Sequence, residues 1–370
     1  MSIFQAMPHF RPDLEGLVTY VPGRPIQDVA REIGMEPDDI VKLASNESPE
    51  GPFPGVSEAI ARVLEGSNRY PDSDVHDLTF GMADDLGVNH DQVWFGAGST
   101  GLLGAIALSM GGAGTSAVYA WPSFVMYRII SRWAGTDAVE IPLDGGHRHD
   151  LDAMRAAIRY DTTVVYVCNP NNPTGTIVSG DGLAGFIESI PESALVVVDE
   201  AYHHFVSDPS YRSFLGAATE RPNVLVLRTF SKVYGLAAQR IGYAVGDAGL
   251  LEKLRRTQAP FTVSSVAQAA ALASLGNDGE MKRRVDANAA GRHHLAGVFS
   301  ERGLDHADSQ TNFVYFRLGD DSGAVASRFV RQGVIVRPLS GGWIRVTIGT
   351  GAEMERFVSA LDVAIAEQAY

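Results

Sequence analysis

The stretch "NVLVLRTFSKVYGLAAQR", residues 223–240, begins as an apolar run and ends in a polar segment. A run rich in Val and Leu without polar alternation predicts a strand that is buried on both faces, as in a parallel sheet covered by helices. Thr229, Ser231 and Lys232 follow this strand directly, and Arg240 comes eight residues after the lysine. The stretch raises the question of which chemistry needs two hydroxyls, a lysine and an arginine beyond the end of a buried strand.

Three further apolar runs have the same character and alternate with helical stretches; they are residues 116–121, 163–170 and 194–200. This alternation predicts an α/β fold with a mostly parallel central sheet flanked by helices. The alternating "WIRVTIG" (343–349), with the helical regions around it, predicts a smaller α+β domain. We therefore predict three parts: an N-terminal arm with part of the small domain over 1–45, a large domain over 46–264, and a small C-terminal domain over 265–370.

Composition narrows the class of protein. The 370 residues carry a net charge of −14, which argues against nucleic acid and membrane partners, because phosphate binding needs clustered Lys and Arg. Cys168 is the single cysteine, so no disulfide can form within the chain. The start "MSIFQAMPHF" does not resemble a signal peptide, and "ALVVVDE" is too short to span a bilayer. We expect a soluble, cytoplasmic protein.

Polar residues cluster just beyond three of the predicted strands, at 169–172, 199–202 and 229–232. In open parallel sheets, ligands bind at the carboxyl ends of the strands, so we predict the site there. Asp199 would be buried and would need a cation, such as a protonated ring nitrogen of a cofactor; the alternative is a helix N-cap. Lys232 could form a Schiff base and Arg240 could hold a phosphate, whereas the alternatives are a surface lysine and a surface ion pair.

Two glycine patterns require separate interpretations. "GAGSTGLLGAIAL" (96–108) is a turn that leads into an apolar helix, where the N–H groups of Ser99 and Thr100 could bind a phosphate or could simply begin the helix. "GDGLAG" (180–185) matches a dinucleotide fingerprint, but a weak strand precedes it and no suitable acid follows, so we expect no dinucleotide there. We also expect no metal site, because His147 and His149 lack a third ligand nearby.

"CNPNNPTG", "VVVDEAYHHF" and "RTFSKVYGLAAQRIGY" occur in this order along the chain. Together they resemble the fold-type I pyridoxal-phosphate (PLP) aminotransferases, specifically the histidinol-phosphate and aromatic aminotransferase subgroup. "YVPGRPI", "NRYPD" and "PFTVSSVAQAAALASL" extend the resemblance over nearly the whole chain. It implies a large PLP-binding domain and a smaller domain formed by both chain ends.

The resemblance also implies an activity. The leading expectation is transfer of the amino group of histidinol phosphate to 2-oxoglutarate, giving imidazole acetol phosphate and glutamate. An aromatic amino acid such as phenylalanine is the alternative donor. A PLP decarboxylase acting on a phosphorylated amino acid is an alternative of another class, and a regulatory protein without turnover is a third. The subgroup further implies a homodimer with shared active sites.

By resemblance, the catalytic residues are Lys232, which carries PLP and moves the substrate proton, Asp199, which pairs with the pyridinium nitrogen, and Tyr202. Asn172 and Tyr202 would form hydrogen bonds with the 3′ oxygen of the ring, and Phe124 would stack on its face. The remaining cofactor contacts would be those to the phosphate, from Ser99, Thr100, Thr229, Ser231, Arg240 and Tyr70 of the partner subunit. The substrate contacts would come from Tyr20, Asn172, Arg337 and Arg345, with Arg345 gripping a carboxylate or phosphate.

Some positions depart from the pattern of the subgroup. Thr100 and Gly101 stand where acidic residues usually follow the phosphate-loop serine, and Ala238 and Gln239 replace the usual Gly-Leu before Arg240. The spacing between Lys232 and Arg240 is kept, so their roles are expected to survive. These differences, and "FTVSS" (261–265), shift the expectation somewhat toward an aromatic substrate.

Overall fold

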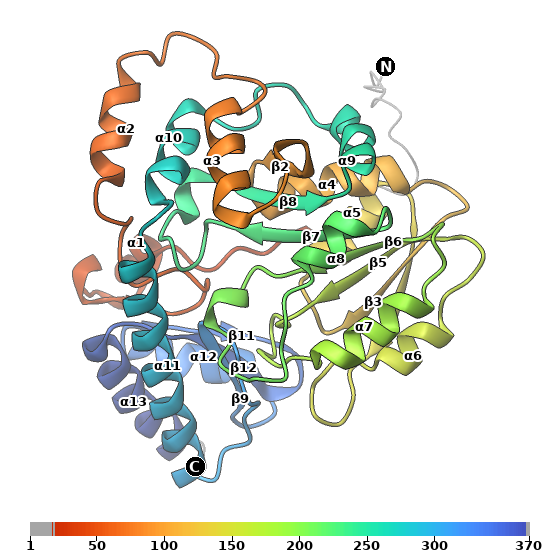
Figure 1. Ribbon diagram of the computed structural model, residues 1–370. Coiled ribbons are helices and arrows are strands. Elements are labelled where there is room, and N and C mark those ends of the chain that lie inside the picture. Colours follow the sequence, from red (N-terminus) through yellow and green to blue (C-terminus); the bar gives the residue numbers. More distant parts are fainter. Residues whose placement is uncertain (1–16, 18, 368–370) are drawn as a thin grey trace, which may run out of the picture.

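The computed structural model describes residue 17 and residues 19–367 of the chain. Figure 1 shows a larger part built around one long sheet and a smaller part, in blue, that gathers α11–α13 with β9, β11 and β12. In the described residues no helix is long and apolar enough to cross a membrane.

The large sheet has seven strands in the order β2-β8-β7-β6-β5-β3-β4. The strands in that order are β2 (Val93–Gly96), β8 (Gly242–Gly246), β7 (Val224–Thr229), β6 (Leu195–Asp199), β5 (Thr162–Cys168), β3 (Ser116–Trp121) and β4 (Asp137–Pro142). Strands β7, β6, β5, β3 and β4 are parallel, and β8 runs antiparallel to both of its neighbours. The predicted α/β fold with a mostly parallel sheet is confirmed.

The strands are apolar throughout because helices cover both faces of the sheet. Val196 and Val198 of β6 pack into a core with α7, whereas Leu195 and Val197 of the same strand point to a second core with α4 and α5. One face carries α4 (Gly98–Met110), α5 (Met126–Trp133) and α9 (Ala248–Leu254), and the other α6 (Leu151–Ala156), α7 (Gly180–Ser189) and α8 (Leu215–Glu220). The residues that alternate along a strand therefore enter different cores, and both sets must be apolar.

The glycine pattern at 180–185 lies inside helix α7. Ser179 caps this helix by accepting a hydrogen bond from the backbone N–H of Gly182. A Cβ at Gly180 would meet the Arg212 side chain at 2.5 Å, so this glycine is explained by close packing.

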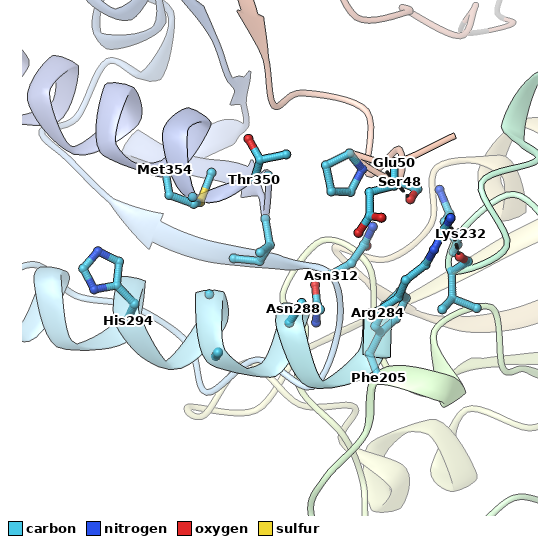
Figure 2. A pocket seen from close by; sticks show the side chains of 18 of the residues that line it. Ser48, Glu50, Phe205, Lys232, Arg284, Asn288, His294, Asn312, Thr350 and Met354 are labelled. Atoms are coloured by element: carbon cyan, nitrogen blue, oxygen red, sulfur yellow. Dashed lines mark hydrogen bonds between the residues drawn. The ribbon is translucent and has the colours of Figure 1, made fainter. Parts of the chain in front are cut away.

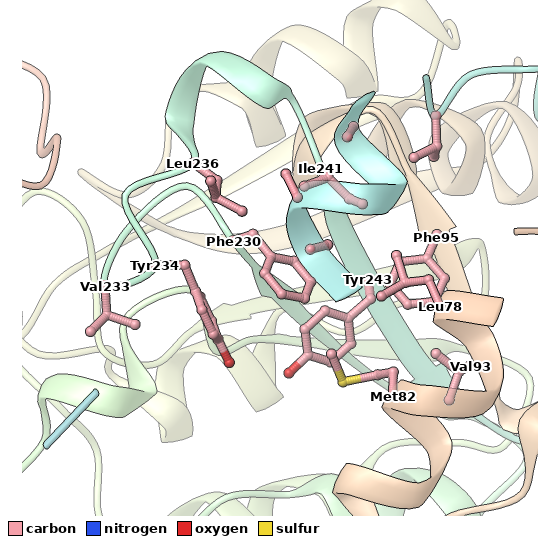
Figure 3. Packing of buried hydrophobic residues seen from close by; sticks show 14 of the residues in the cluster. Leu78, Met82, Val93, Phe95, Phe230, Val233, Tyr234, Leu236, Ile241 and Tyr243 are labelled. Atoms are coloured by element: carbon pink, nitrogen blue, oxygen red, sulfur yellow. The ribbon is translucent and has the colours of Figure 1, made fainter. Parts of the chain in front are cut away.

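A third core fixes the backbone around Lys232. It contains Phe230, Val233 and Tyr234 in one cluster with Leu78 and Met82 of α3 (Figure 3). Its helices are α2 (Val56–Leu64), α3 (His76–Leu86) and α10 (Ser265–Ser274). Because α10 packs on α2 and α3, we propose that the boundary between the domains falls after this helix rather than at 264/265.

The smaller part joins both ends of the described chain. Strand β1 (Val41–Lys42) pairs in parallel with β10 (Val334–Ile335), and helix α1 (Ile26–Ile33) packs on the same C-terminal region through Val29 and Ala30. Its other elements are α11 (Asp278–Glu301), β9 (Phe313–Arg317), α12 (Ser322–Arg331), β11 (Arg337–Pro338), β12 (Trp343–Thr347) and α13 (Gly351–Ala366). Strands β11, β12 and β9 form an antiparallel sheet in that order. The prediction that both chain ends build the smaller domain is confirmed.

Short 3₁₀ helices occupy several of the connections; they are η2 (Pro37–Asp39), η3 (His90–Gln92), η4 (His203–Phe205), η5 (Ala237–Gln239), η6 (Arg255–Thr257) and η7 (Ser340–Gly342).

Candidate active site

A cavity of about 600 Å³ lies at the carboxyl ends of β5, β6 and β7, between the large sheet and the antiparallel sheet of the smaller part. It is lined by all but one of the residues that the sequence singled out: Tyr20, Ser99, Thr100, Phe124, Asn172, Asp199, Tyr202, Thr229, Ser231, Lys232, Arg240, Arg337 and Arg345. The exception is Tyr70. Parallel strands end at the same edge of a sheet, which brings these distant segments together.

Lys232 is half-buried, and its Nζ donates a hydrogen bond to the backbone oxygen of Asn46 at 3.1 Å. Desolvation by the cavity walls lowers the pKa of Lys232 to about 8, and the nearby positive charge of Arg345 acts in the same direction. A neutral amine is the nucleophilic form of lysine. This lysine is thus prepared to react with a carbonyl group close to neutral pH.

Asp199 is only 2% exposed and is held by two donors. Tyr127 donates its hydroxyl to Oδ2 at 2.9 Å, and the backbone N–H of Ala201 donates to Oδ1 at 3.1 Å. Burial raises the pKa of Asp199 to about 6, against the hydrogen bond from Tyr127, which lowers it. The next helix is the short η4, whose N-cap is Tyr202, so Asp199 does not cap it. A cationic group in the cavity would relieve the desolvation of this carboxylate.

The start of helix α4 and the Arg240 side chain enclose a concave corner of the cavity. Gly98 has a positive φ of 69°, and a Cβ there would meet Nη2 of Arg240 at 2.5 Å. Nη1 of Arg240 lies 3.4 Å from the Ser231 hydroxyl, which in turn accepts a hydrogen bond from Thr229 at 3.0 Å. Helix N–H groups, hydroxyls and a guanidinium together are the donor set that a phosphate requires. These residues therefore fit the phosphate of PLP.

Asn46, which the sequence analysis did not single out, connects several site residues. Its Nδ2 donates to the Tyr202 hydroxyl at 2.9 Å, and its backbone oxygen accepts from Asn312 as well as from Lys232. The residue has a φ of 53°, a conformation that Asn tolerates better than most residues. An Asn between two predicted elements was the only available signal, and its contacts depend on segments far away in the sequence.

Two arginines and a tyrosine form a row across the small antiparallel sheet. Arg345 of β12 pairs in register with Arg337 of β11 on one side and with Tyr315 of β9 on the other. Arg345 donates to Oδ1 of Asn172 at 2.5 Å and to the backbone oxygen of Ala44 at 2.8 Å. Its Nε is buried without a hydrogen-bond partner in the described protein. Burial lowers the pKa of Arg345 to about 10, and the neighbouring Arg337 contributes. The two neighbouring guanidiniums give this row positive charge, and such groups can bind an anion.

Tyr20 is 55% exposed at the rim of the cavity, and Arg337 donates to the backbone oxygen of the adjacent Val21 at 2.9 Å. Tyr70 lies apart from the cavity. It is 83% exposed and stacks on Phe261 with ring centroids 4.7 Å apart. Its role requires a second chain and stays a prediction.

A second cavity, of about 620 Å³, is also bordered by Lys232 (Figure 2). It runs along α11 to His294 and the start of α13 at Met354. Its buried Arg284 donates hydrogen bonds to Glu280 and to the backbone oxygen of Val233. This cation is therefore already paired within the protein. The groups suited to hold a phosphate and a ring lie in the first cavity, and we place the active site there. Among the residues that the structure covers, no cluster of His, Cys, Asp or Glu is arranged to hold a metal.

Comparison with known proteins identifies the class. A lysine with a lowered pKa, a buried carboxylate and a corner suited to a phosphate, at the strand ends of an α/β sheet, are the features expected of a PLP-dependent transferase of fold type I. Residues 38–361 match the model of the family "Aminotransferase class I and II". The chain belongs to this family and is a PLP-dependent aminotransferase.

The relatives include proteins of two named activities. The chain is 42% identical over 364 residues to histidinol-phosphate aminotransferase 1 of Cupriavidus pinatubonensis, with 96% of each chain covered. It is 40% identical over 358 residues to an aromatic amino acid aminotransferase of Streptomyces avermitilis, with 97% of this chain and 98% of the relative covered. The crystal structure of histidinol-phosphate aminotransferase from Sinorhizobium meliloti in complex with pyridoxal 5′-phosphate superposes with a TM-score of 0.89 at 28% identity, covering 98% and 99% of the two chains.

Proposed function

We propose that this aminotransferase takes its amino group from histidinol phosphate and passes it to 2-oxoglutarate, producing imidazole acetol phosphate and glutamate. The observation that carries the proposal is the row of Arg337 and Arg345 in the same cavity as Lys232, because two guanidiniums side by side suit a phosphate dianion. Relatives that are 42% identical and named histidinol-phosphate aminotransferases support the same donor. Membership of the aminotransferase family favours transamination over the decarboxylation considered from the sequence.

An aromatic amino acid is the second candidate donor. Relatives that are 40% identical carry that name. The Tyr315 ring borders the cavity and stacks on Trp343 with ring centroids 4.2 Å apart, which gives the substrate side an aromatic wall. A planar ring can pack against such a wall whether or not the substrate has a phosphate.

In the proposed reaction PLP, when bound, supplies an electron sink and carries the amino group between the two half-reactions. Its phosphate contacts would be the N–H groups and side chains of Ser99, Thr100, Thr229, Ser231 and Arg240. Asp199 would form an ion pair with the protonated ring nitrogen, and Phe124 would cover one face of the ring. Asn172 and Tyr202 would form hydrogen bonds with its 3′ oxygen.

Lys232 would have two tasks in this scheme. It would hold the cofactor covalently between turnovers, and its freed Nζ would then take the proton from the substrate Cα. A pKa of about 8 suits both tasks, because the amine can lose and regain a proton near neutral pH. Arg345, already bonded to Asn172, would anchor the anionic group of the donor.

We further propose a cytoplasmic homodimer in which Tyr70 reaches the cofactor phosphate of the partner. Its 83% exposure at a distance from its own cavity supports this role. Sedimentation at assay concentration should show a dimer, and a fully active monomer would exclude the shared site.

The donor is decided by a kinetic panel. Histidinol phosphate, phenylalanine, tyrosine and aspartate should each be assayed with 2-oxoglutarate, and kcat/KM for histidinol phosphate should be the highest. A higher value for phenylalanine or tyrosine would establish the aromatic donor instead. Release of carbon dioxide without glutamate formation would contradict transamination itself.

A further inference from the structure

The hydroxyl of Tyr127 is bonded to the carboxylate that the proposed function places against the cofactor ring. Tyr127 is fully buried and donates to Oδ2 of Asp199 at 2.9 Å, while Oδ1 receives the backbone N–H of Ala201. Each carboxylate oxygen therefore has its own donor, and the plane of the carboxylate is fixed from two sides. Tyr127 was not singled out in the sequence.

Helix α5 and a group of aromatic rings hold Tyr127 in place. Tyr127 and Ile130 are three residues apart on α5, so both face the sheet. The Tyr127 ring stacks on Tyr166 with centroids 4.8 Å apart and an interplanar angle of 6°. It also meets Phe124 edge to face, at 5.7 Å and 90°. Phe124 borders the active-site cavity. The Tyr127 side chain therefore contacts both Phe124 and the Asp199 carboxylate.

This arrangement has an electrostatic consequence. Burial raises the pKa of Asp199 to about 6, and the hydrogen bond from Tyr127 is the largest influence that opposes it. A hydrogen bond to a charged group is stronger than one between neutral groups, and its loss leaves a buried oxygen without a donor. Tyr127 therefore favours the ionised, oriented form of Asp199.

We propose that Tyr127 is a positioning residue for the cofactor ring: its hydroxyl orients the Asp199 carboxylate, and its ring fixes Phe124 beside it. The inference rests on the proposed function, in which Asp199 pairs with the ring nitrogen of PLP. The competing explanation is that Tyr127 only packs the core. The two explanations differ in one respect, because only a positioning role depends on the nitrogen of the cofactor ring.

The test measures binding of two cofactors to the apoprotein. PLP is compared with its 1-deaza analogue, in which carbon replaces the ring nitrogen, and each dissociation constant is followed by protein fluorescence. Tyr127→Phe keeps the stacked ring and removes the hydroxyl. We expect this variant to bind PLP about tenfold more weakly, the size typical of losing a hydrogen bond to a charged group, and to bind the analogue about as well as the unaltered protein does.

Tyr166→Phe is the matched control, because it removes a buried hydroxyl from the same stack without touching Asp199. It should leave the ratio of the two dissociation constants unchanged. In an Asp199→Asn background, Tyr127→Phe should no longer alter that ratio, because the effects of two substitutions are not additive when one residue acts through the other.

The outcomes distinguish a failure of the role proposed for Asp199 from a failure of the role proposed for Tyr127. If Asp199→Asn alone leaves the preference for PLP over the analogue intact, the proposed role of Asp199 fails. If Asp199→Asn abolishes the preference but Tyr127→Phe weakens both cofactors equally, Tyr127 is a packing residue and this inference is overturned. Should Tyr127→Phe not fold, 3-fluorotyrosine at position 127 keeps the shape and strengthens the donor. The fluorinated protein should bind PLP more tightly and the analogue as before. An equal change in both dissociation constants would again overturn the inference.

Discussion

The two walls of the active-site cavity are built in different ways. The cofactor wall consists of residues at or just beyond the carboxyl ends of strands of the large sheet, such as Asp199, the last residue of β6, and Lys232, shortly after β7. The substrate wall consists of Arg337, Arg345 and Tyr315, which meet only through the register of three short antiparallel strands. A contiguous motif identifies the first wall, whereas the second depends on pairing between distant segments. This difference explains why the class of reaction is clear and the donor is still a proposal.

Lys232→Ala should have the largest effect of any change on the cofactor wall. It removes the covalent attachment and the proton carrier together, so transamination should fall by at least about a thousandfold. The phosphate contacts remain, and the variant should still bind PLP. Borohydride reduction of the unaltered enzyme, followed by peptide mapping, should find the label on Lys232. A label on any other lysine contradicts the assignment.

Asp199→Asn should have the next largest effect. The variant lacks the anion that stabilises the protonated ring nitrogen, and breaking a buried charge pair costs about 3–5 kcal/mol. We expect the half-reaction with the amino donor to slow by roughly a hundredfold to several thousandfold, as followed by stopped-flow absorbance. Asp181→Asn, at a side chain that is 96% exposed, is the control and should be neutral. Near-normal activity of Asp199→Asn would show that this residue is structural.

The sequence predicted the cofactor wall better than the elements that support it. Lys232 and Arg240 lie within one motif, and the structure places both in the cavity. Asn46 and Tyr127 were missed, because the first acts through an unusual backbone conformation and the second through a ring cluster that joins α5 to β5. Helix α10 was placed in the small domain because its apolar pattern does not show which core it joins. Local patterns predict elements, and tertiary contacts decide their partners.

On the substrate wall, Arg345→Lys should raise KM for every anionic donor by about ten- to a hundredfold. A planar guanidinium can bind two oxygens at once and a lysine amine cannot. The absorbance spectrum of the bound cofactor should stay the same, because lysine keeps the positive charge that Arg345 places near Lys232. Arg317→Lys on β9, where the arginine pairs with Asp320 at the surface, is the control. A changed cofactor spectrum would show that the two walls are not independent.

The pH dependence of PLP attachment tests whether the cavity lowers the pKa of Lys232 before the cofactor binds. With its pKa lowered from 10.5 to about 8, the amine is mostly protonated below pH 8 and neutral above it. The rate at which added PLP becomes reducible onto Lys232 should therefore rise about tenfold for each pH unit up to about 8 and then level off. A rate that continues to rise toward pH 10 would show that the cavity does not lower the pKa of Lys232.

The smallest effect expected is also the one that separates the two candidate donors. Arg337 is half-buried beside Arg345 and reaches the rim of the cavity, where it bonds the backbone of Val21. If histidinol phosphate is the donor, Arg337→Ala removes one of the two cations that suit its phosphate dianion, whereas Arg345 alone can still hold the single negative charge of the phenylalanine carboxylate. We expect kcat/KM for histidinol phosphate to fall about tenfold more than for phenylalanine, a difference of one hydrogen bond to a charged group. If both substrates lose the same factor, Arg337 does not distinguish a phosphate from a carboxylate, and the support that the arginine row gives to histidinol phosphate is lost.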